Sequence, residues 1–104
     1  MIIVTSSVIP GKEIKKSFGI VRGNTVRVRH LGKDILALFK NIVGGEIEEY
    51  TKLLAESRDQ SVDRMIESAK ELGANAIVDI RFSTSYIMSN AAEILVYGTA
   101  VYSE

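Results

Sequence analysis

The chain has 104 residues, a length that fits one domain with a single hydrophobic core. Hydrophobic residues make up 46% and charged residues 25%, which is typical of a folded domain and not of a disordered chain. The absence of cysteine excludes disulfides, thiolate metal ligands and cysteine nucleophiles. Because no apolar run approaches a membrane span and the N-terminus lacks a signal-peptide pattern, we expect a cytoplasmic protein without a membrane partner.

Charge is distributed unevenly, although the formal net charge is zero. Residues 1–45 carry a net charge of +6, and residues 46–104 carry −6. The two halves could neutralise one another inside one fold. If they lie on opposite flanks, they favour head-to-tail contact between copies, which closes into a ring or continues as a filament.

The first third of the chain reads as β structure. Residues 2–5 form a short β-branched run, and Pro10-Gly11 is a strong turn signal. We expect two further strands at about 14–23 and 25–30, with Gly23-Asn24 between them as a hairpin turn or a bulge. Because a glycine has no side chain to pack, Gly19 or Gly23 is expected to mark a close approach of another backbone.

The middle third has helical periodicity. Apolar residues recur at three- and four-residue spacing over 33–43, and a longer stripe runs over 46–72. Gly44-Gly45 separates the two predicted helices as a hinge. Gly73 is placed to adopt the left-handed conformation that ends the long helix.

The last third predicts two strands, at about 76–85 and 93–102. Val78, Ile80 and Phe82 alternate with polar residues, so we expect them to face the long helix together. The final strand is apolar on both faces, which requires cover on both sides. A second subunit would supply that cover, and the predicted interface residues are Ile94, Val96, Tyr97 and Val101.

Two sequence blocks resemble a known family. The first is Ile42-Val43-Gly44-Gly45-Glu46, and the second is Leu72-Gly73-Ala74-Asn75-Ala76 together with Tyr97-Gly98-Thr99-Ala100-Val101. In combination they resemble the YbjQ (UPF0145) family of small prokaryotic proteins, over nearly the whole chain. The resemblance implies a single α+β domain over 1–104, with a dodecin-like layout in which a small curved, mainly antiparallel sheet packs on one long and one shorter helix. It also implies self-assembly into a ring, with five copies expected. The family carries the description of a heavy-metal-binding protein, so the resemblance implies metal binding as well.

Metal binding has limited support from the residues themselves. Divalent metals need several converging ligands, and soft ions prefer sulfur or imidazole. The chain has one histidine, His30, which lies beside a cationic residue. Glu46 and Glu49 lie close together at the start of the long helix and could bind a hard divalent cation, but acidic residues there also suit the helix dipole. In a ring, symmetry would multiply one ligand per subunit.

Two other function classes stay open. No nucleophile lies in a recognisable catalytic context, so an enzyme would need an active site between subunits, and the sequence favours a non-enzymatic role. Basic residues of the N-terminal half could bind nucleic acid, but aromatic stacking positions are scarce among them and the pI is about 6.6. The sequence therefore predicts a self-assembling protein that binds a small ligand or metal ion at a subunit junction.

Overall fold

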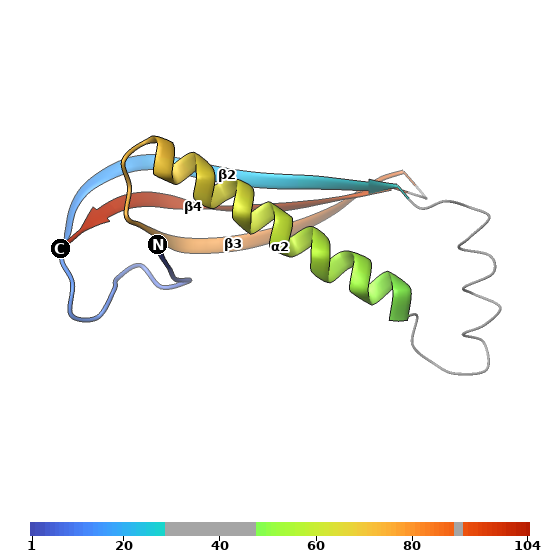
Figure 1. Cartoon of the computed structure of the whole chain (residues 1–104), viewed down its shortest axis with the longest axis horizontal. Coiled ribbons are helices and arrows are strands. Elements are labelled where there is room, and N and C mark those ends of the chain that lie inside the picture. Colours follow the sequence, from blue (N-terminus) through green and yellow to red (C-terminus); the bar gives the residue numbers. More distant parts are fainter. Residues whose placement is uncertain (29–47, 89–90) are drawn as a thin grey trace.

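The computed structural model describes residues 1–28, 48–88 and 91–104, which form four strands and one helix (Figure 1). In chain order they are β1 (Ile2–Ile3), β2 (Ile14–Val28), α2 (Glu48–Glu71), β3 (Ala76–Met88) and β4 (Ala91–Ser103). The predicted helix over 33–43 and the first residues of the one over 46–72 lie outside the described residues.

The four strands form one mixed sheet in the order β1-β3-β4-β2. β4 is antiparallel to both of its neighbours, whereas β1 pairs in parallel with β3. β2 and β3 are therefore parallel to each other, with α2 as the crossover and β4 inserted between them. This arrangement confirms the predicted α+β class and the mainly antiparallel sheet.

Helix α2 lies diagonally across one face of the sheet, mainly over β2 and β4 (Figure 1). The long strands make the molecule elongated, with extents of 54 × 23 × 16 Å. Its radius of gyration is 17.3 Å, against roughly 13 Å for a compact domain of this length. Helix α2 covers only part of such a long sheet.

The C-terminal end of α2 follows the sequence prediction. Gly73 has a φ of 89°. Its N–H donates to the Lys70 carbonyl at 3.0 Å, and the Ala74 N–H donates to the Ala69 carbonyl at 3.1 Å. These two bonds form a Schellman motif, which satisfies carbonyl groups that the helix end would otherwise leave unpaired.

β2 is one continuous strand, so the predicted hairpin or bulge at Gly23-Asn24 is wrong. Gly23 pairs with Val96 and Asn24 with Leu95 in regular register, and the two register shifts lie earlier, between Ile14 and Lys16 and between Ser17 and Gly19. The expected close approach of another backbone is confirmed at Gly23. A Cβ atom there would overlap the Ser61 carbonyl oxygen of α2 and lie 2.6 Å from the Met65 amide nitrogen.

β3 contains a bulge that the alternation of its sequence does not reveal. Asp79 has a φ of 54°, in the left-handed region, and the register with β4 shifts between Val78 and Arg81. The bulge reverses the side-chain alternation, so Ile77 and Ile80 pack in the core under α2 while Val78 packs on the opposite face. The prediction that Val78, Ile80 and Phe82 share one face was wrong for Val78.

The core has two parts, one on each face of the sheet. The larger part lies under α2 and contains Met65, Ala69, Val96 and Ala100. The smaller part covers the opposite face at one end, where Ile9 and Val4 of the N-terminal segment pack over Ala76, Val78 and Val101. The chain therefore covers both faces of the C-terminal half of β4 by itself.

Candidate functional site

The distal half of β3 is the most exposed apolar element that the structure describes. Every residue from Arg81 to Met88 is exposed. The apolar members are Phe82, Tyr86, Ile87 and Met88, with exposed fractions of 51%, 75%, 55% and 58%. The segment Phe82–Met88 carries no charged residue, which is unusual for an exposed edge strand because charges normally prevent such strands from pairing with other chains.

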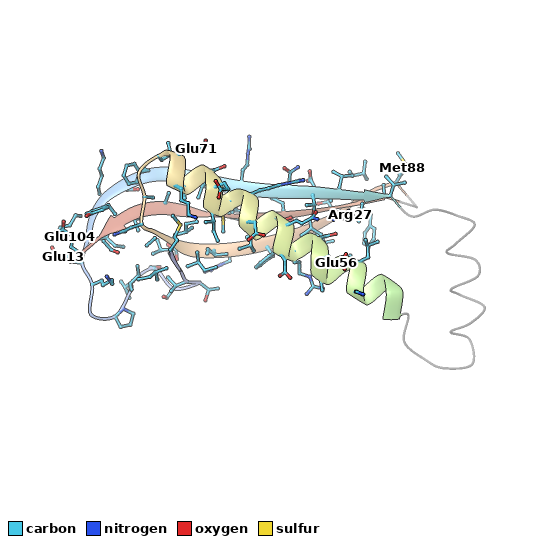
Figure 2. The ribbon with its side chains drawn as sticks, in the orientation of Figure 1. Glu13, Arg27, Glu56, Glu71, Met88 and Glu104 are labelled. Carbon is cyan, nitrogen blue, oxygen red and sulfur yellow. The ribbon has the colours of Figure 1, made fainter. Side chains whose placement is uncertain are left out.

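The outer edge of β3 has a strand partner only near its beginning. β1 pairs with Ala76 and Ile77, and the residues after β1 accept hydrogen bonds from the Asp79 and Ile80 amides. Within the described ranges, no backbone partner follows along the outer edge of Phe82–Met88. Figure 2 shows Met88 at the far end of the strands from Glu13 and Glu104. We call Phe82–Met88 the free edge of β3.

An apolar groove lies between α2 and β3, next to the start of the free edge. Its volume is about 160 Å³. Its apolar lining residues come from β1 and the residue after it, from α2 and from β3: Ile3, Val4, Val62, Met65, Ile80 and Phe82. Met65 is fully buried at its base, whereas Phe82 is half exposed at its margin. Thr5 adds the one polar side chain of the lining.

A polar layer joins β2 to α2 on the other flank of the helix. Ser57 and Ser61 are fully buried in α2, and the Ser61 hydroxyl lies 3.0 Å from that of Thr25. Arg27 donates from Nε to the Ser57 hydroxyl at 2.7 Å and also bonds Gln60, and Figure 2 shows its side chain between β2 and α2. The basic strand thus contacts the helix through neutral acceptors. Each buried hydroxyl has a hydrogen-bond partner on the facing element. These bonds fix the position of α2 on β2, because a shift of the helix would leave buried polar groups unpaired.

The predicted interface residues divide into two groups. Ile94, Val96 and Val101 are at most 2% exposed. Val96 packs in the core under α2 and Val101 packs under the N-terminal segment, while the Ile94 carbonyl accepts a hydrogen bond from Ser61 of α2. They offer no surface to a second copy. Tyr97 is 41% exposed on the face opposite α2, where it pairs with Arg22 of β2 and Arg81 of β3.

Further apolar residues share that open face with Tyr97. Ile20 and Val26 of β2 are 79% and 49% exposed, and both pair with residues of the same face of β4. Sequence reasoning missed both this surface and the free edge of β3. The uncharged run Phe82–Met88 was the available signal for the free edge.

The predicted metal ligands cannot be assembled into a site. His30 and Glu46 lie outside the described residues, and Glu49 is placed only as part of the α2 backbone. Among residues 1–28, 48–88 and 91–104, no group of three or more histidine or carboxylate side chains comes close enough to hold a metal ion. A metal site built on His30, Glu46 and Glu49 stays a prediction.

No helix in the described part of the chain is both long and apolar enough to cross a membrane.

The fold is similar to that of a solved protein. The similar protein is a protein with unknown function from Pediococcus pentosaceus, whose crystal structure is assigned to the DUF74 family. The TM-score is 0.72 at 16% identity, over 100% of this chain and 98% of that one.

Similarity in sequence is stronger. A UPF0145 protein of Thermosipho melanesiensis is 59% identical over 101 residues, and one of Archaeoglobus fulgidus is 56% identical over 101 residues. Each alignment covers 97% of this chain and 94% of the relative. The YbjQ family model, described as "Putative heavy-metal-binding", matches residues 1–104. The chain belongs to the YbjQ (UPF0145) family.

Proposed function

We propose that the protein acts as a homo-oligomeric ring whose subunits join through the edges of their sheets and create small-ligand sites at the junctions. The free edge of β3 is the observation that carries this proposal. A long, uncharged and exposed edge strand is an aggregation hazard unless another strand pairs with it. In the ring, the neighbouring copy supplies that strand.

The outer edge of β2 is the proposed partner of the free edge. β2 and β3 lie at opposite sides of the β4 strand, and within the described residues the outer edge of β2 is also without a strand partner. Pairing of β3 with the β3 strand of another copy would leave both β2 edges open. Pairing of β3 with β2 of the next copy uses both edges and closes by rotation into a ring. The family resemblance supports five copies.

The position of α2 also favours this junction. The helix-side face of β3 at Phe82 and Tyr86 has little cover from the described elements of its own chain, whereas α2 lies close to β2. When β2 of a neighbour adds to β3, the neighbour's α2 comes with it and can cover that face. Tyr97 and the exposed apolar residues Ile20 and Val26 then lie on the opposite face of a continuous sheet.

Light scattering on the full chain tests the assembly. We expect a mass of about five times the 11.4 kDa of one chain at micromolar concentration. Tyr86→Lys, which places a charge on the free edge, should lower the mass toward that of one chain. The matched control is Tyr102→Lys, because Tyr102 is also exposed but belongs to the inner strand β4, where it pairs with Lys16. A monomeric unmodified chain would overturn the proposal.

Metal binding is the second candidate, and the family description favours it. We propose that His30, Glu46 and Glu49 supply ligands to a divalent cation, with symmetry in the ring completing the set. Calorimetric titration with Zn²⁺, Ni²⁺ and Cu²⁺ should give heat that the triple substitution His30→Ala, Glu46→Gln and Glu49→Gln removes. Heat that the triple variant retains would assign the metal to other residues, and no heat from the unmodified protein would end the metal proposal.

A further inference from the structure

The groove between α2 and β3 has a lining that selects for one class of ligand. Six of its seven described lining residues are apolar and the seventh is Thr5, so none of the described lining residues is acidic, basic or a histidine. A charged ligand would lose its hydration there without gaining an ion pair from these residues. The Met65 thioether is the one soft metal ligand in the lining, and one ligand does not hold a metal ion.

The size of the groove limits the ligand further. Its volume is about 160 Å³. Enclosed apolar cavities of about 150 Å³ bind benzene or xenon, which gives the scale of ligand that such a volume holds. The groove therefore matches an uncharged molecule of one ring or a short branched chain, and Thr5 at the lining can hydrogen-bond a single polar atom of that molecule.

The groove is open on one side, and the free edge of β3 continues directly from it. Phe82 belongs to both, since it lines the groove and is the first residue of the free edge. A strand of another copy that pairs with Phe82–Met88 would run past the mouth of the groove. In the ring proposed above, this strand of the neighbouring copy would shield the groove from water at each subunit junction.

We propose that this groove is a binding site for a small, uncharged, apolar or aromatic molecule, which buries itself against Met65 and Ile80 beneath Val62 and Phe82. The groove belongs to a single chain, and only its closure rests on the proposed function. Binding removes apolar surface of the groove from contact with water.

Methyl NMR of the full chain with indole as the probe tests this site. The Met65 ε-methyl and the methyl groups of Ile80 and Val62 should shift together in a saturable titration. Val62→Phe adds volume at the helix side of the groove and should weaken indole binding at least tenfold. The matched control is Val26→Phe, because Val26 is 49% exposed on the opposite face of the sheet and should leave binding unchanged.

Light scattering on the same samples separates this proposal from the ring. A ring without indole shifts at Met65 would overturn the ligand site and leave the assembly standing. A monomer whose Met65 shift is lost in Val62→Phe would support the groove and overturn the ring. Shifts that spread over exposed methyl groups and persist in Val62→Phe would show nonspecific apolar binding and overturn the site.

Discussion

The Asn75 side chain pairs with the backbone of Ser103 as a neighbouring strand would. Its Nδ2 donates to the Ser103 carbonyl at 2.8 Å, and its Oδ1 accepts the Ser103 N–H at 2.8 Å. The Asn75 N–H also donates to the Val101 carbonyl at 3.1 Å. One residue between α2 and β3 thus fixes the C-terminal end of β4.

Asn75→Ala should lower the free energy of unfolding by about 1–3 kcal/mol, because it removes three partly buried hydrogen bonds to Ser103 and leaves the Ser103 backbone groups unpaired. Urea unfolding followed by circular dichroism measures the change. The matched control is Asn24→Ala, which removes one exposed bond to Glu93 and should cost less than about 0.5 kcal/mol. Equal losses in the two variants would contradict the structural role of Asn75.

Gly23→Ala should destabilise the protein by at least about 2 kcal/mol, because the added methyl group meets the backbone of α2 at Ser61 and Met65. The helix would have to move away from β2 and break the buried hydroxyl layer. Gly11 is the control that separates the effect of steric overlap from the effect of backbone strain. Gly11 has a φ of 80° and open space around it, so Gly11→Ala should cost only about 1 kcal/mol. A smaller loss at Gly23 than at Gly11 in thermal unfolding would refute the close packing.

Asp79→Gly should be nearly as stable as the unmodified protein, whereas Asp79→Ala should lose about 1 kcal/mol. Glycine relieves the cost of the left-handed conformation at φ 54°, which offsets the lost hydrogen bond from the Ser7 hydroxyl. Alanine loses the bond and keeps the strain. Paired denaturant titrations measure the difference, and an alanine variant at least as stable as the glycine variant would argue against the bulge.

The parts of the fold that depend on local chemistry could be predicted from the sequence. The end of α2 at Gly73 is one example, because only glycine adopts the required conformation at low cost. The close approach at Gly23 is another, although its partner in α2 could not be named. The continuous strand through Gly23-Asn24 could not be predicted, because Val96 and Leu95 of β4 stabilise an extended conformation where local preference suggests a turn.

The candidate site was harder to predict because it depends on which parts of the sheet the helix and the N-terminal segment bury. A strand with two apolar faces requires cover, but its sequence does not say whether the same chain supplies it. Here α2 and Ile9 bury Val96 and Val101, so the exposed surface shifts from β4 to the distal part of β3. The bulge at Asp79 also decides which side chains of β3 face the groove, and no periodicity reveals it.

Amide hydrogen exchange along the free edge tests the central claim most directly. In a lone chain, the alternate amides of Phe82–Met88 that point away from β4 have no backbone acceptor among residues 1–28, 48–88 and 91–104 and should exchange at nearly unprotected rates. In the ring, the strand of the neighbouring copy accepts them, so we predict protection along the whole segment, lost in Tyr86→Lys. Rapid exchange of those alternate amides in the unmodified protein, beside a protected β4, would contradict the account.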